Sequence, residues 1–220
     1  MSVIIRDLQQ QDYLECWHAM RDFTQQRTPD TPDELWLVEH PAVFTQGQTG
    51  KTEHILNPKA IPIVQSDRGG QVTYHGPGQL IVYTLIDLKH RQLSIRQLVS
   101  ALENSVIQLL AAYTIPAQSR CDAPGVYVDQ QKICSVGLRV KQRRYAYHGI
   151  ALNVAMDLTP FSQINPCGYA GMHMTQLAHF IPGISVADIK PQLVDYLCQQ
   201  LRYTAVHHSK TASEVADATC

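Results

Sequence analysis

A glycine-rich segment between two apolar runs constrains this chain more than any other feature. Residues 68–78 read RGGQVTYHGPG, with four glycines, one proline, a cation and a histidine. Glycine tolerates positive φ and lets a backbone approach another group closely, and a simple hairpin turn needs only one or two. The segment therefore predicts a backbone that wraps a bound group, with a plain hairpin turn as the alternative.

The residue types in this segment limit what it could bind. Arg68 could hold an anion, and backbone N–H groups near Gly69 and Gly70 could cradle an oxygen. The segment lacks both the Lys-Ser/Thr ending of a P-loop and the Gly-x-Gly-x-x-Gly of a dinucleotide-binding turn, and a strand-like run follows it. These absences exclude the two commonest nucleotide loops.

Size and composition predict one domain without a polyanionic or membrane partner. The chain has 220 residues, 45% hydrophobic and 17% charged, which is enough for one sizeable core. A net charge of -1 gives no reason to expect nucleic acid, and no apolar run approaches the roughly 18 residues that span a bilayer. We expect a domain over residues 1–207 and a polar tail over 208–220.

The six cysteines are scattered, without a framework spacing and without CxxC. This pattern, with no basic and apolar leader in the first residues, predicts reduced thiols in a cytoplasmic protein. It gives no reason to expect a structural metal site.

Hydrophobic periodicity predicts a mixture of helices and strands. Apolar spacings of three and four predict helices over 12–23, over 95–113 after a Ser94 cap, and over a C-terminal stretch to about Tyr203, where Pro191 obscures the start. Strand-like runs cover residues 34–40, 61–65, 79–85, 125–128, 132–140 and 145–154.

Two further segments carry candidate chemistry. Cys167 lies between a proline and a glycine, a turn that could expose a nucleophilic thiol, although a small buried cysteine is the alternative. Lys132 leads into an apolar strand, where burial could depress its pKa, although an exposed corner lysine is the more ordinary interpretation. Cys134 shares a strand face with Lys132 and is a rival thiol.

Three histidines lie beside these segments: His75, His148 and His173. Each could act as a base, but a hydrogen-bonding scaffold role is more ordinary.

Taken together, these segments resemble the lipoyl(octanoyl) transferase family, the octanoyl-acyl-carrier-protein:protein N-octanoyltransferases. The resemblance extends in order from about Glu34 to Met172. It is carried by residues 39–41 (EHP), 68–79 (RGGQVTYHGPGQ), 125–128 (GVYV), 132–133 (KI), 136–139 (VGLR), 148–153 (HGIALN) and 166–168 (PCG).

The resemblance implies an α+β fold, a single catalytic domain like that of the biotin and lipoate protein ligases and related to class II aminoacyl-tRNA synthetases, with a mixed sheet packed with helices. It implies that Cys167 is the nucleophile, forming an acyl-thioester, and that Lys132 lowers the pKa of the thiol. Cys134 and Ser135 stand where the family usually has alanine-like residues, which adds a second thiol near the site. The implied acyl pocket is lined by Arg68, Gly69, Gly70, Gln71, Val72, Thr73, Tyr74, His75, Ser135, Val136, Gly137, Gly149, Ile150 and Ala151.

The activity implied by the resemblance is transfer of an octanoyl group from octanoyl-acyl carrier protein to a lysine of a lipoyl domain, in lipoate biosynthesis, with no cofactor and no metal. The implied acceptors are the lipoyl domains of 2-oxoacid dehydrogenase complexes and the glycine cleavage H protein. One alternative is an ATP-dependent lipoate or biotin ligase on the same fold, which needs no nucleophilic cysteine, so Cys167 argues against it. Another is a non-catalytic module that binds lipoyl domains or acyl carriers, which a meeting of Lys132 with Cys167 in space would disfavour.

Overall fold

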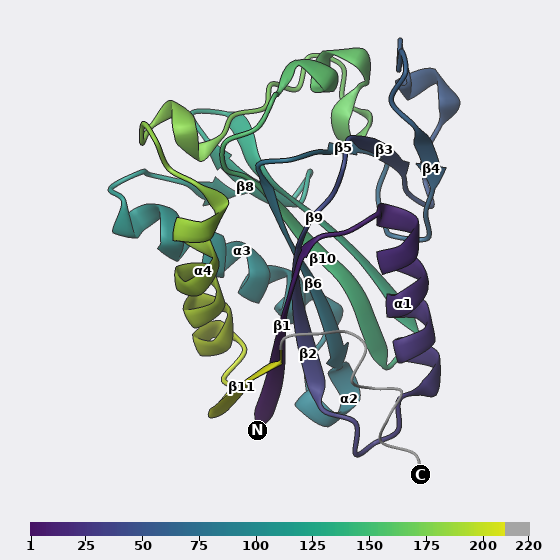
Figure 1. Cartoon of the computed structure of the whole chain (residues 1–220), viewed down its shortest axis with the longest axis vertical. Helices are drawn as coiled ribbons and strands as arrows, with labels where there is room; N and C mark the ends of the chain where they lie inside the picture. The colour runs from purple at the N-terminus through teal and green to yellow at the C-terminus, as the bar shows by residue number, and fades with distance from the viewer. Residues whose placement is uncertain (210–220) are drawn as a thin grey trace.

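The structure is a computed structural model that describes residues 1–209. Within these residues a large mixed sheet forms the centre of the molecule (Figure 1). Its strands are β1 (Ser2–Gln10), β2 (Asp33–Glu39), β6 (Gln79–Asp87), β7 (Gln118–Ser119), β8 (Gly125–Val128), β9 (Gln131–Lys141), β10 (Tyr145–Asn153) and β11 (Ala205–Ser209).

The strand order is β11-β1-β2-β6-β10-β9-β8-β7. Strand β1 pairs in parallel with both β11 and β2, whereas the pairs from β2 to β7 are antiparallel. Every residue of β6 and of β10 is buried, as expected for strands in the middle of a sheet that is covered on both faces.

Helices cover the two faces of this sheet (Figure 1). Helix α1 (Tyr13–Gln26) packs Cys16 and Met20 onto one face, against alternate residues of β6 such as Ile81. Helices α3 (Ile95–Ala112) and α4 (Val186–Gln200) pack on the opposite face, over the larger apolar core. The short helix α2 (Leu88–Arg91) follows β6 directly.

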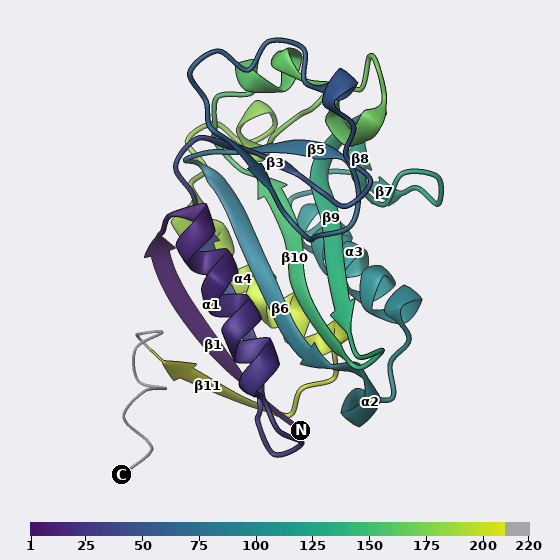
Figure 2. The same ribbon diagram turned by 90° about the vertical axis from the view of Figure 1, so that its right-hand side faces the viewer.

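A second, three-stranded sheet lies at one end of the molecule (Figure 2). It consists of β3 (Val43–Gln46), β4 (Ile63–Gln65) and β5 (Val72–His75), in the order β4-β3-β5. Phe44, Val72 and Tyr74 from this sheet pack against Phe161 in a separate small core. The short 3-10 helices are η1 (Thr52–His54), η2 (Thr159–Gln163), η3 (Pro166–Gly168) and η4 (Leu177–His179).

Most predicted elements are present, and the capping signals mark real helix starts. Ser94 caps α3 in a capping box with Gln97. A second capping box at Ser185 starts α4, which continues through Pro191 and ends at Gln200, short of the predicted end. No helix within residues 1–209 has the length and apolar character to cross a bilayer.

Three expectations about the chain were incomplete or wrong. Strand β1 was not predicted, because its alternation of apolar and polar residues is interrupted by Arg6 and Asp7. The glycine-rich segment is not a plain turn, since it contains strand β5. His208 and Ser209, assigned to the tail, instead pair with β1 at the edge of the sheet, and residues 210–220 lie outside the described residues.

Candidate active site

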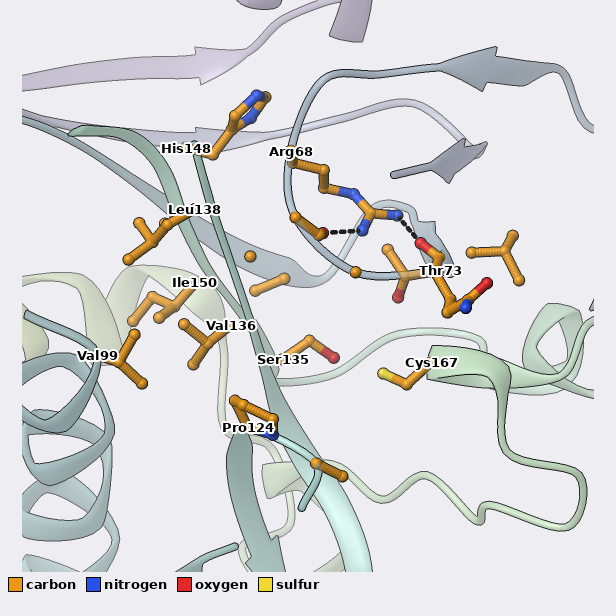
Figure 3. A pocket seen from close by; sticks show the side chains of 18 of the residues that line it. Arg68, Thr73, Val99, Pro124, Ser135, Val136, Leu138, His148, Ile150 and Cys167 are labelled. Atoms are coloured by element: carbon orange, nitrogen blue, oxygen red, sulfur yellow. Dashed lines mark hydrogen bonds between the residues drawn. The ribbon is translucent and has the colours of Figure 1, made fainter. Parts of the chain in front are cut away.

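A cavity of about 490 Å³ lies where the glycine-rich segment, β9, β10 and the start of α3 meet (Figure 3). Every residue predicted to line the acyl pocket borders it except Tyr74, and so do Cys167 and Lys132. Thr73 and His75 border the cavity, whereas Tyr74 packs into the small core against Phe44, as strand alternation requires. The inclusion of Tyr74 was therefore wrong, because a strand within the segment turns its side chain away.

The structure brings Lys132 and Cys167 into direct contact. Lys132 Nζ lies 3.1 Å from Cys167 Sγ, although the residues are 35 positions apart in the chain. The backbone N–H of Lys132 donates to the carbonyl of His173 at 2.9 Å, and the N–H of Thr175 donates to the carbonyl of Lys132 at 3.0 Å. These two bonds tie the start of β9 to the segment after Cys167 and so fix the pair.

The cysteine is presented on a tight turn. Pro166 opens helix η3, and Cys167 itself adopts φ 58°, followed by Gly168 at φ 81°. Left-handed backbone is uncommon for residues other than glycine and marks a specially held position. Cys167 is partly exposed and faces the cavity in Figure 3, which is the setting expected of a nucleophile and not of a core cysteine.

Lys132 is buried, with 1% of its surface exposed, which excludes the exposed-corner interpretation. Burial by itself would lower the pKa of this lysine, but the facing charge of Cys167 and contacts with Tyr127 raise it above its ordinary value. The Nζ atom also lies 5.4 Å from the centre of the Tyr127 ring. The depressed pKa that burial could have produced is therefore not found, because an opposite charge and not an apolar wall faces the ammonium.

Cys134 does not compete with Cys167 for the nucleophilic role. It is 1% exposed and packs in the large apolar core with Ile133 and Val126. Burial raises the pKa of the Cys134 thiol to about 12, so little thiolate forms near neutral pH.

The guanidinium of Arg68 is held by oxygen atoms of the chain itself. This buried guanidinium donates to the hydroxyl and carbonyl of Thr45, to the carbonyl of Gly69 at 2.9 Å and to that of Gln71 at 2.7 Å. The N–H of Gly69 donates to the carbonyl of Leu138 at 2.9 Å. Oxygen atoms of the chain thus occupy donors of Arg68 and Gly69 that were predicted to hold an anion and an oxygen, which argues against such a site at these two residues.

The side chains of His75 and His148 make hydrogen bonds that fit the scaffold interpretation. Burial lowers the pKa of His75 to about 3, and its Nδ1 lies 2.7 Å from Gln79 Oε1. Burial also lowers the pKa of His148, whose Nε2 lies 2.9 Å from Asp67 Oδ1. His173 is exposed and contributes its backbone carbonyl to the bond with Lys132.

Several residues that border the cavity were missed. Ile95 and Val99 lie one helical turn apart at the start of α3, beside the apolar stripe that predicted this helix, and their spacing was a usable signal. Leu138 follows Val136 by two residues on the same strand face, which was also a usable signal. Distant segments bring the others together: Tyr13, Thr49, Ile81, Tyr83, Asp122, Ala123, Pro124 and Tyr169. Among residues 1–209 no group of three or more histidine, cysteine or acidic side chains is arranged to hold a metal ion.

Comparison with known proteins agrees with this site. The family model of the lipoyl protein ligase A/B catalytic domain matches residues 12–198. An octanoyltransferase of Yersinia pseudotuberculosis serotype O:3 (strain YPIII) is 59% identical over 202 residues, which cover 92% of this chain and 86% of the relative. The chain belongs to this family, among its octanoyltransferases. The predicted family, enzyme class and activity are thereby confirmed.

The fold of this octanoyltransferase is shared with the ligases. A bi-partite lipoate protein ligase from Thermoplasma acidophilum superimposes with a TM-score of 0.78 at 14% identity, covering 98% of this chain and 90% of the ligase. The biotin protein ligase of Aquifex aeolicus gives a TM-score of 0.53 at 14% identity over 91% of this chain and 69% of that protein. These likenesses confirm the predicted fold class.

Proposed function

We propose that this octanoyltransferase works through an octanoyl-thioester on Cys167, with Lys132 as the residue that receives and returns protons. The observation that carries the proposal is the 3.1 Å contact between Lys132 Nζ and Cys167 Sγ at the wall of the cavity. An ammonium at this distance favours the thiolate, which is the nucleophilic form of cysteine.

In the first half of the reaction the Cys167 thiolate attacks the carbonyl carbon of octanoyl-acyl carrier protein. A new carbon–sulfur bond forms to Cys167, and the bond to the carrier's thiol breaks. The departing thiolate takes a proton from the Lys132 ammonium. The products are the acyl-enzyme, neutral Lys132 and the free carrier thiol.

In the second half the acceptor is a lysine of a lipoyl domain. Neutral Lys132 takes one proton from its ε-ammonium, and the resulting amine attacks the Cys167 thioester. The carbon–nitrogen bond forms, the thiolate of Cys167 leaves, and the second proton passes to solvent. Conversion of a thioester to an amide is downhill, so ATP is not needed, and ping-pong kinetics are expected.

The cavity suits the apolar chain of the acyl group. Val99, Val136, Leu138 and Ile150 gather at the end away from Cys167 in Figure 3. Each buried methylene contributes about 0.8 kcal/mol, so such a wall binds an eight-carbon chain firmly. The sulfur therefore lies where the carbonyl of a chain seated in this cavity would be.

The proposed partners are octanoyl-acyl carrier protein as donor and the lipoyl domains of 2-oxoacid dehydrogenase complexes and the glycine cleavage H protein as acceptors. Support comes from the named activity of the relatives, and a structural neighbour is described together with its E2 lipoyl domain. A cytoplasmic location belongs to the same proposal, supported by the free thiols of Cys16, Cys121, Cys134, Cys167 and Cys198.

The test is intact-mass analysis after incubation with octanoyl-acyl carrier protein. The wild-type chain and Cys134→Ala should gain one octanoyl group, and Cys167→Ala should gain none. An acyl adduct on Cys167→Ala would refute the assignment of the nucleophile. Efficient modification of an apo lipoyl domain from free octanoate and ATP would instead favour the ligase alternative.

A further inference from the structure

A buried carboxylate lies behind the Lys132–Cys167 pair and has no part in the mechanism above. Glu103, on the inner face of α3, is 7% exposed. Within residues 1–209 it forms no salt bridge, and its Oε1 accepts the backbone N–H of Gly125 at 2.8 Å. Burying a carboxylate costs free energy unless nearby donors or charges compensate, so a buried glutamate on this face of α3 indicates a specific role.

The partner of Glu103 forms a wall of the space that holds Lys132. Gly125 starts β8 with φ 142°, and a Cβ atom there would lie 2.5 Å from Lys132 Cε and 3.2 Å from Nζ. The backbone can approach the lysine stem this closely because it carries no side chain. The hydrogen bond from Gly125 to Glu103 therefore holds the surface against which the lysine packs.

Glu103 also acts on Lys132 through its charge. Burial raises the pKa of Glu103, while the Gly125 N–H and the Lys132 ammonium oppose that rise. The other titratable groups around the ammonium are Cys167 on η3 and Tyr127 on β8, with Cys134 behind it on β9. Arg120 contacts the ring of Tyr127, 5.1 Å from its centre.

We propose that Glu103 is a positioning residue for the acyl-transfer reaction: it fixes the Gly125 backbone against Lys132, and its negative charge keeps Lys132 in the ammonium form. The inference rests on the proposed function of the Lys132–Cys167 pair. The same charge opposes the Cys167 thiolate, so Glu103 limits how far the pair ionises in the free enzyme. The charge of Glu103 would thus act on Lys132 in addition to the charges of Cys167 and Tyr127.

Removing the charge of Glu103 should shift the ionisation of Cys167 and Lys132 in a defined direction. Glu103→Gln keeps an oxygen that can accept the Gly125 N–H but carries no charge. Both the Cys167 thiolate and the neutral form of Lys132 then form at lower pH. We expect the pH dependence of Cys167 alkylation to move down by roughly 0.5 pH unit, which is about a threefold faster reaction below the midpoint.

The experiment measures alkylation of Cys167 by iodoacetamide against pH, read by mass spectrometry of the peptide that contains it. Glu103→Gln should show the downward shift, and Glu103→Asp, which keeps the charge, should retain the wild-type midpoint. Glu15→Gln, an exposed glutamate on α1, is the control for a general change of net charge. The pH profile of octanoyl transfer should move in the same direction for Glu103→Gln.

Coincident profiles for wild type and Glu103→Gln would overturn the inference, and so would an equal shift in Glu15→Gln. A downward shift in Glu103→Asp equal to that in Glu103→Gln would show that the charge is not responsible, which would also overturn it. Failure of the proposed function can be told apart from failure of this inference, because the wild-type chain itself would then take up no octanoyl group on Cys167.

Discussion

The far end of the cavity should set the length of acyl chain that the enzyme accepts, and Val99 is the residue with which to test this. Its side chain lies with Val136, Leu138 and Ile150 at the end away from Cys167 (Figure 3). It is partly buried near the start of α3, so a larger side chain can enter the cavity without disturbing the main core. Val99→Phe should therefore shorten the space available to the chain.

The size of the effect follows from the methylene groups displaced. If the ring takes the place of the last two carbons of an octanoyl chain, the loss is about 1.6 kcal/mol at about 0.8 kcal/mol per CH₂. That free energy corresponds to roughly a 15-fold fall in kcat/KM for octanoyl transfer. A hexanoyl donor ends before the new side chain, so its kcat/KM should change by less than about twofold.

The assay compares hexanoyl, octanoyl and decanoyl donors with one lipoyl domain, in the wild-type chain, Val99→Phe and Val99→Ala. The alanine variant should improve decanoyl transfer, because it lengthens the cavity. Asn104→Phe, on the exposed side of the same helix, adds the same ring outside the cavity and should leave the ratios unchanged. Equal losses for hexanoyl and octanoyl donors in Val99→Phe would show that the chain does not extend to this end.

Three further predictions concern proton transfer and pH. Lys132→Arg should lose nearly all transfer activity, because a guanidinium cannot give up its proton, and turnover like that of the wild-type chain in steady-state assays would remove Lys132 from the mechanism. Cys167→Ala should lower the pKa of Lys132, because it removes the facing charge and leaves burial; NMR titration of labelled lysine measures this, and an unchanged or higher pKa would contradict it. The free energy of unfolding should fall as pH drops from about 6.5 toward 4. Burial lowers the pKa of His40 to about 4 and that of His75 to about 3, so in this range the unfolded chain binds protons at these histidines that the folded chain does not. His40→Gln should flatten that slope in denaturant titrations, and an unchanged slope would assign the acid sensitivity to other groups.

The sequence predicted which residues carry the chemistry of the site better than it predicted how the fold brings them together. Cys167 between a proline and a glycine, and Lys132 at the start of an apolar strand, carry signals in their immediate neighbours. Their contact does not, because it depends on the bonds between the start of β9 and residues 173–175, which join segments far apart in the chain. Local patterns identify residue types suited to a task, and long-range pairing decides whether they meet.

Arg68 and Tyr74 show why the glycine-rich segment was harder to interpret. A cation beside glycines is the usual mark of an anion site, but the donors of this guanidinium bind carbonyls of the segment itself and the hydroxyl and carbonyl of Thr45. The segment folds as loop and strand together, so its alternate residues face opposite sides, and Tyr74 faces the small core. Neither outcome could be derived without knowing that β5 pairs with β3.

The raised pKa of Lys132 fits the proposed mechanism better than the depressed pKa that burial alone would give. Burial lowers the pKa of this lysine, whereas the Cys167 charge and the contacts with Tyr127 raise it, and in the free enzyme the raising contributions prevail. In the proposed mechanism, acylation turns the Cys167 thiolate into a neutral thioester, so the charge that faces Lys132 is lost while burial remains. We expect the pKa of Lys132 to fall at that point, which is the step in which the lysine would deprotonate the incoming ammonium. On this mechanism, formation of the acyl-enzyme generates the neutral Lys132 that the second half of the reaction needs as a base.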